Sequence, residues 1–242
     1  MSIAITTTAP PRSPDRSIAG LIALAVAFVA AFVAVPPALT PGGPGGGQQG
    51  LTDAVRQAFA GYWSAGGRAL TPDLQRLVDY WVRYLTIKAV FAALLLVTLV
   101  TLVVRLRNGW ARIAAGTLAL GATAVLMANV QGILAPFNVL VPMLVGDPSG
   151  GQLDQIRQQL TTGPRSAALD AMVDNYSYSH LVMVYMAGFV ALVLIVLSVR
   201  LGRWRGLLTA VPALAMIVLA FANATTVADP VPKFLMLFQG GW

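Results

Sequence analysis

The residues able to do chemistry are few in this chain of 242 residues. There is no cysteine and a single histidine, His180, and all nine acidic residues are aspartates. Without cysteine there are no disulfides, thiolate metal sites or thiol nucleophiles. One histidine leaves metal and haem sites without their usual ligands. We therefore predict no cofactor and no metal. For His180 we expect an interfacial side chain at the outer end of an apolar stretch; the alternative is ligand or acid–base work.

Two asparagines interrupt otherwise apolar stretches. Asn129 follows Arg112 by 17 residues, or ~25 Å along a helix at ~1.5 Å per residue. Asn223 follows Arg205 by 18 residues, which places it at a similar height in a later stretch. We expect each to hydrogen-bond a neighbouring helix, a contact worth about 0.6 kcal/mol in membranes. The alternative is that both line a shared polar cavity, with Gln131 and Thr225 nearby.

Two aspartates occupy equivalent positions ahead of apolar stretches. Asp79 and Asp174 each precede an arginine, Arg105 or Arg200, by 26 residues, or ~39 Å of helix. This exceeds a hydrocarbon core of ~30 Å, so both carboxylates belong at or outside the membrane surface. Asp79 can pair with Arg83, whereas Asp174 has no such partner in its own helix. We expect cap or surface ion pairs; the alternative is an acidic pair that attracts cations or a partner's arginine.

The elements that hold these residues are transmembrane helices. The chain is 57% hydrophobic and only 10% charged, with mean hydropathy +0.74, whereas soluble domains carry about 25% charged residues. The fold class is therefore an all-α polytopic membrane protein with five spans. The predicted spans are Ile18–Val35, Leu85–Val104, Ile113–Ala135, Leu181–Val199 and Leu207–Ala228. The first could instead be a signal peptide; we interpret it as a retained span.

The charges predict the orientation. Eight arginines and one acid, Asp15, lie before the first span and in the turns after the second and fourth spans; the other segments hold eight Lys/Arg and eight Asp. The positive-inside rule then predicts a cytoplasmic N-terminus, with the C-terminus and both large loops extracytoplasmic. The Ala/Arg/Gly/Pro-rich composition indicates a bacterial plasma membrane. The basic pI is a topology signal, so we predict no nucleic-acid partner.

The chain also contains an apparent duplication. Residues Leu74–Leu106 align without a gap on Leu169–Leu201, which matches Asp79 with Asp174 and Arg105 with Arg200. After a shift of one residue, Trp110, Ala128-Asn129 and Pro136 match Trp204, Ala222-Asn223 and Pro230. We predict parallel tandem units of helix, external loop and helix. The alternative is that membrane helices resemble one another by composition. The predicted divisions are 1–17 (a disordered cytoplasmic tail), 18–106 (first repeat), 107–201 (second repeat) and 202–242 (fifth span and an external apolar tail).

The external segments contain apolar pieces too short to cross a membrane. Pro36–Gly50 is a Gly/Pro linker, followed by an amphipathic helix from Leu51 that Leu153–Leu160 repeats more weakly. We expect these helices to lie in the outer membrane interface or on a partner subunit. Phe137–Val145 and Val231–Phe238 are expected along the interface or as re-entrant pieces. For the C-terminal tail, which ends at Trp242, we favour the lipid interface over a partner protein.

These observations disfavour catalysis, because no phosphate loop, nucleophile pair or metal cluster is visible. We predict a non-catalytic accessory, scaffold or assembly subunit of a larger bacterial envelope or energy-transducing complex. The alternatives are a small transporter or channel, or a lipid or hydrophobic-ligand binder in the outer leaflet. The expected partners are other integral membrane or envelope subunits, lipid, and further copies of the chain as a homo-oligomer.

Overall fold

A computed structural model describes residues 16–145 and 151–239; for residues 203–205 it describes the backbone only. Most of the predicted N-terminal tail, Trp242 and the side chain of Trp204 therefore lie outside the described residues.

Five long helices confirm the all-α prediction: α1 (Arg16–Leu39), α3 (Pro72–Arg105), α4 (Gly109–Leu134), α7 (Ala167–Leu201) and α8 (Arg203–Ala228). Each is long and apolar enough to cross a membrane. Helices α3 and α7 begin well before the spans predicted for them. They contain 34 and 35 residues, which corresponds to a length of ~50 Å. That length exceeds a ~30 Å hydrocarbon core, so each helix is longer than a membrane crossing requires.

Short turns join the long helices into two hairpins. Between α3 and α4, the side chain of Asn108 accepts hydrogen bonds from the backbone of Trp110 and Ala111 and so caps α4. Between α7 and α8, Gly202 adopts φ +75°, a conformation that other residues rarely take. The helices then approach closely, since a Cβ added at Gly206 would lie 2.5 Å from the carbonyl oxygen of Ser198.

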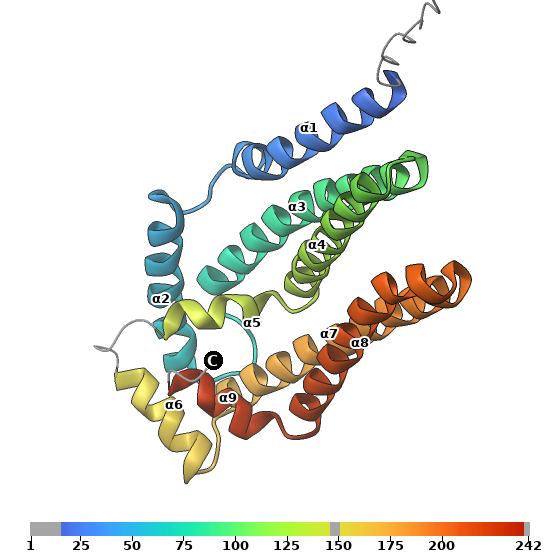
Figure 1. The fold of residues 1–242 in the computed structure, drawn as a ribbon. Coiled ribbons are helices and arrows are strands. Elements are labelled where there is room, and N and C mark those ends of the chain that lie inside the picture. The colour runs from blue at the N-terminus through green and yellow to red at the C-terminus, as the bar shows by residue number, and fades with distance from the viewer. Residues whose placement is uncertain (1–15, 146–150, 240–242) are drawn as a thin grey trace, which may run out of the picture.

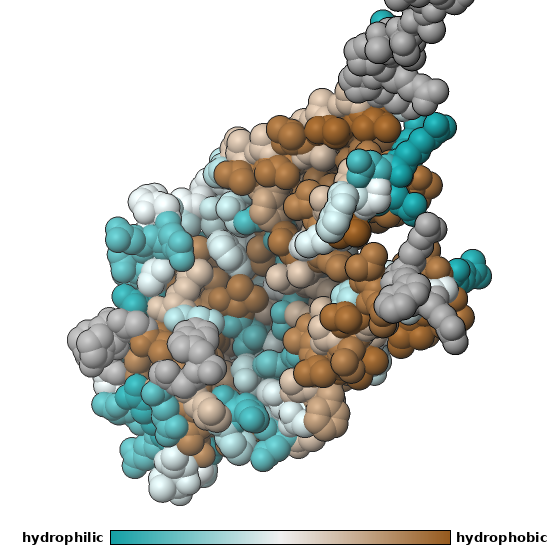
Figure 2. Space-filling view, viewed as in Figure 1, coloured by the Kyte–Doolittle hydropathy of each residue, from teal (hydrophilic) through white to brown (hydrophobic). Residues whose placement is uncertain are grey.

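The long helices form two arms (Figure 1). The first arm consists of α1, α3 and α4, and the second of α7 and α8. Between the arms, α4 contacts α7 through a much smaller interface than those within the hairpins. Figure 2 shows apolar surface along both arms, as expected for helices that face lipid.

The remaining elements gather at one end of the arms. They are α2 (Gly47–Ala65), α5 (Pro136–Leu140), the 3₁₀ helix η1 (Val141–Leu144), α6 (Gly151–Thr161) and α9 (Pro230–Phe238). Together with the first turns of α3 and α7 they form the cap. The side chains that are almost fully buried within it include Tyr62, Leu74, Leu140, Ile156, Leu169, Met172, Phe234 and Phe238.

The short apolar pieces pack within the chain. In Phe137–Val145 and Val231–Phe238, the side chains of Phe137, Leu140 and Phe234 are buried in the cap core. The amphipathic helices α2 and α6 turn their apolar faces into the same core. Each piece is too short to fold alone, and together they remove one another's apolar surface from water.

Candidate functional site

A polar seam joins the two arms next to the cap. It begins where α4 ends and the chain turns at Ala135, with φ −131° and ψ 62°, into the proline that opens α5. This turn directs both Gln131, in the last turn of α4, and Asn138, on α5, toward α7. The seam is therefore positioned by a proline-initiated change of helix direction.

The first part of the seam connects α4 and α5 to α7. Gln131 Nε2 donates to the backbone oxygen of Ser179 at 3.1 Å, and Asn138 Nδ2 donates to Ser179 Oγ at 2.7 Å. The backbone N–H of Asn138 donates to Asn175 Oδ1 at 2.8 Å. Ser179 is fully buried, and its hydroxyl donates to the carbonyl oxygen of Tyr176. Two side chains of α7, those of Asn175 and Ser179, thus bind Asn138 on α5, and Gln131 on α4 binds the α7 backbone.

The second part of the seam connects α7 to α8. His180 Nδ1 lies 2.7 Å from Asn223 Oδ1, while Asn223 Nδ2 donates to the carbonyl oxygen of Leu219 at 2.8 Å. Because the Asn223 oxygen can only accept, the proton of the neutral imidazole belongs on Nδ1. The His180 ring also packs edge-on against Tyr176, with ring centroids 4.5 Å apart. Asn223 is a buried interhelical contact of the kind expected from the sequence.

Asn129 behaves differently from Asn223. Its side chain is buried, and Nδ2 donates to the carbonyl oxygen of Val125 in its own helix at 2.7 Å. Among the described residues, Asn129 forms no hydrogen bond with Asn223 or with α7. The described contacts thus connect Gln131 on α4 and Asn223 on α8 to α7, at Ser179 and His180, whereas Asn129 bonds only within α4.

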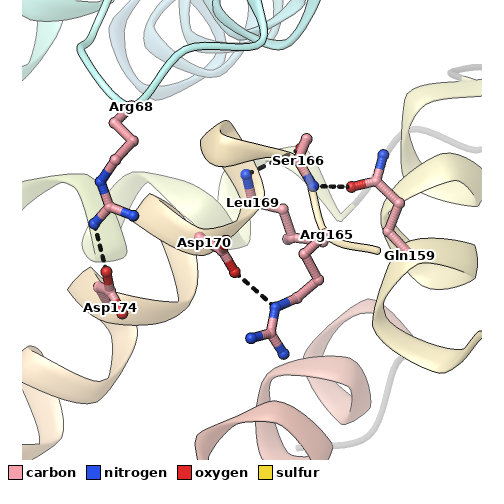
Figure 3. A network of polar contacts seen from close by, with 7 residues as sticks. All are labelled: Arg68, Gln159, Arg165, Ser166, Leu169, Asp170 and Asp174. Carbon is pink, nitrogen blue, oxygen red and sulfur yellow. Dashed lines mark hydrogen bonds and ion pairs between the residues drawn. The ribbon is translucent and has the colours of Figure 1, made fainter. Parts of the chain in front are cut away.

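The two predicted aspartates lie on the cap surface. Asp174 accepts a hydrogen bond from Arg68 at 2.5 Å, and Arg68 comes from the loop between α2 and α3 (Figure 3). This hydrogen bond and the carboxylate charge raise the pKa of Arg68. Asp79 accepts from Gln75 Nε2 at 2.7 Å in its own helix, rather than from Arg83. Both are surface contacts, and neither carboxylate is buried.

A second ion pair lies close to the first. Arg165 Nε donates to Asp170 Oδ1 at 2.7 Å, and the backbone N–H of Ser166 donates to Gln159 Oε1 at 2.8 Å. Ser166 caps α7 by accepting from the N–H of Leu169 (Figure 3). These contacts fix the loop between α6 and α7 and so the start of the second arm.

One cation lies against aromatic rings within the first arm. Lys88 Nζ lies 4.4 Å from the ring centre of Phe32 on α1 and 5.4 Å from that of Tyr84 on α3. In a cation–π contact, the positive charge is attracted electrostatically to the face of the aromatic ring. Lys88 thereby links α1 to α3.

Taken together, the seam is an arrangement of neutral amides, hydroxyls and one imidazole that are paired with one another. Such a set holds helices together, and each of its side chains takes part in at least one of the hydrogen bonds given above. Within residues 16–145 and 151–239, no group of three or more His, Asp, Glu or Cys side chains is placed to hold a metal ion.

Sequence reasoning did not single out Asn138, Asn175 and Ser179. Their signal is weak but present: Asn175 and Ser179 are four residues apart and so share one face of α7. Asn138 follows a proline within an apolar piece, where a polar amide has few roles other than a buried hydrogen bond.

Comparison with known protein families, with curated proteins and with solved structures finds no match to this chain. The functional argument therefore rests on the residues and their contacts.

Proposed function

We propose that this chain is a non-catalytic integral membrane subunit with an accessory, scaffold or assembly role in a larger bacterial envelope or energy-transducing complex. The observation that supports this most is how little of the spans the chain covers by itself. Within the most apolar 18-residue stretch of α1 no residue is buried, and in α8 the buried share is 6%. Two arms that meet through a small contact between α4 and α7 offer long apolar sides to other helices.

The polar contacts support the same proposal. The seam residues bind one another, so they serve to set the relation between the arms rather than to hold a substrate. The cap likewise buries its own aromatic side chains. Such a chain positions helices for other subunits and needs no catalytic groups of its own.

For the membrane location we propose the bacterial plasma membrane, with the N-terminus cytoplasmic and the cap outside. The support is the charge distribution along the sequence. The natural chain lacks cysteine, so single cysteines give a clean test. An impermeant maleimide applied to whole cells should label Gly45→Cys near the cap and spare Gly109→Cys in the α3–α4 turn; neither position has atoms within 4 Å of an added Cβ. The opposite pattern would reverse the proposed orientation.

We also propose that the chain arose by tandem duplication, with α2–α5 and α6–α9 as its two copies. The order of elements supports this: an amphipathic helix, a helix of 34 or 35 residues, a helix of 26 residues, then a short helix that begins at a proline. The aligned residues fall in corresponding elements. These copies have different boundaries from the repeats predicted from the sequence, which were 18–106 and 107–201. With the boundaries proposed here, α1 precedes both copies. Alignment of related sequences in which one copy occurs alone would test it.

The subunit proposal is tested by photo-cross-linking in the native membrane. A photoreactive residue at Val26 on α1 or at Phe221 on α8, which are 65% and 70% exposed, should cross-link to a distinct membrane or envelope protein. The same residue at Gly67, in an open loop of the cap, is the matched control. The tagged chain should co-purify with that protein in mild detergent. A chain that purifies alone or as a homo-oligomer, without such cross-links, would contradict the proposal and favour the transporter alternative.

A further inference from the structure

Nine of the described arginines fall into two groups with different surroundings, and Arg16 and Arg83 belong to neither. In the cap, five arginines each face an aspartate. The pairs are Arg56–Asp53 at 3.9 Å, Arg68–Asp174 at 2.5 Å, Arg157–Asp154 at 2.8 Å, Arg165–Asp170 at 2.7 Å, and Arg76–Asp73. The charge of this group is neutralised within the protein.

The other group lies at the arm tips, which we define as the α3–α4 turn and the α7–α8 turn. Arg105, Arg107 and Arg112 belong to the first turn and Arg200 to the second, and all four are exposed. None of them has an ion pair among the described residues. The seven described aspartates all belong to the cap or its connecting segments, so no described acid is available at the tips.

The two turns lie at the same end of the molecule, away from the cap (Figure 1). Polar atoms mark this end in Figure 2, and apolar surface lies directly behind them along the arms. Next to the arginines, Val104 and Val199 are 77% and 78% exposed. Trp110 is 82% exposed in the same turn, a placement typical of the membrane–water interface.

The surface behind Arg200 is also hollowed. A cavity of about 260 Å³ lies between the ends of α7 and α8, lined by Ser198, Val199, Gly202, Gly206, Leu207 and Ala210. The arm tips thus combine uncompensated guanidinium groups with adjacent apolar surface. A soluble anion would match only the charge, whereas an amphiphilic anion matches both.

We propose that the arm tips bind anionic phospholipid. The guanidinium groups hold the headgroup phosphate, because arginine presents paired N–H donors that fit phosphate oxygens. The acyl chains lie along the apolar flanks of α3 and α7. Each arginine near an anionic membrane surface contributes about 1 kcal/mol, or about a five-fold change in affinity.

The test uses the purified full-length protein in detergent, with native mass spectrometry. Phosphatidylglycerol and phosphatidylcholine of identical acyl chains are added at equal concentration. The natural chain should retain phosphatidylglycerol selectively. The triple variant R105Q/R107Q/R112Q should bind it more weakly, on the order of 100-fold at most.

The matched control is R68Q/R76Q/R165Q, which removes the same net charge from the cap. It should keep the lipid preference of the natural chain. Equal retention of both lipids by the natural chain would overturn the proposal, and so would the same loss in both triple variants. An acidic polypeptide that co-purifies with a chain lacking the lipid preference would also overturn it.

Two measurements on the natural chain keep the proposal testable if the tip variant does not fold. The preference for phosphatidylglycerol should weaken as salt concentration rises, because the contact is electrostatic. Free glycerol phosphate at the same concentration should leave the bound lipid in place. A preference that is independent of salt, or displacement by glycerol phosphate, would contradict binding of headgroup and chains together.

Discussion

Tyr62, on α2, is joined to the start of α7 through its hydroxyl group. It is fully buried, and Oη donates to the carbonyl oxygen of Ala168, at the start of α7, at 3.0 Å. Burial raises the pKa of Tyr62, and the nearby charge of Arg68 lowers it to a smaller extent. The folded state therefore holds the phenol proton more tightly than the unfolded state does.

This gives a pH-dependent prediction. At neutral pH, Tyr62→Phe should lower stability by about 1 kcal/mol, or roughly 2–4 °C in the thermal midpoint. The ordinary pKa of a tyrosine is 10.0, so above pH 10 the phenol is deprotonated in the unfolded natural chain, and the free energy of unfolding of the natural chain falls. The difference in unfolding free energy between the natural chain and Tyr62→Phe should therefore become smaller above pH 10. Thermal unfolding in detergent from pH 7 to 11 measures it, and a constant difference would contradict it.

A second prediction concerns the contact between α7 and α8. In a double-mutant cycle, His180→Phe and Asn223→Leu should show a coupling energy of about 0.6–1.7 kcal/mol, the range of interhelical hydrogen bonds in membranes. The same cycle with Asn129→Leu in place of Asn223→Leu should show less, because Asn129 bonds only its own helix. Equal coupling in the two cycles would argue against the His180–Asn223 contact.

At the residue scale the sequence indicated which side chains matter better than what they contact. Asn223, Gln131 and His180 stood out because polar groups are rare in apolar helices. Their partners did not: the partner of Gln131 is a backbone oxygen 48 residues away, and that of Asp174 is 106 residues away. Hydropathy and spacing contain no information about contacts at such separations.

At the element scale, the tight hairpin of α7 and α8 leads to a third prediction. Gly206→Ala places a methyl group 2.5 Å from a backbone oxygen of Ser198, which cannot move without shifting α7. We expect a loss of about 1–3 kcal/mol from overpacking.

The matched control lies in the opposing helix. Gly188 has no atom within 4 Å of an added Cβ, so Gly188→Ala should be neutral or stabilising by up to about 1 kcal/mol. Thermal unfolding in detergent compares the two variants. A Gly206→Ala chain as stable as Gly188→Ala would contradict the close approach.

The long helices were predictable and the cap was not, for a physical reason. A run of about 20 apolar residues is a local signal, because the membrane thickness requires it. The positions at which α3 and α7 begin were not predicted. Their first turns contain polar residues such as Asp73 and Asp170 and lie outside the apolar run. The short apolar pieces were recognised, but their burial against one another depends on tertiary packing.

At the scale of the whole molecule, the cap is one core assembled from segments spread along the chain. Phe238 closes it: the ring is fully buried against Phe234, with centroids 5.0 Å apart, and its carbonyl oxygen accepts a hydrogen bond from Arg157 Nε at 2.8 Å. Phe238→Ala should therefore cost about 3–5 kcal/mol.

The effect should be confined to the cap. Hydrogen exchange should accelerate in α6 and α9, while the apolar parts of the arms stay protected. Met236→Ala, on the exposed side of α9, is the control and should change little. Uniform acceleration along α4 and α8 would show that the cap and the arms do not unfold separately.

The place of α9 in this core has a consequence for how the protein is made. Residues 47–65 and 151–161 leave the ribosome long before residues 230–238, yet all three belong to one core. The arms can enter the membrane while the cap is still incomplete, with unpaired apolar faces on α2 and α6. A nascent or truncated chain that stops before Pro230 would thus present these faces to chaperones and proteases. The cap core therefore cannot be completed until the chain has been translated through Phe238.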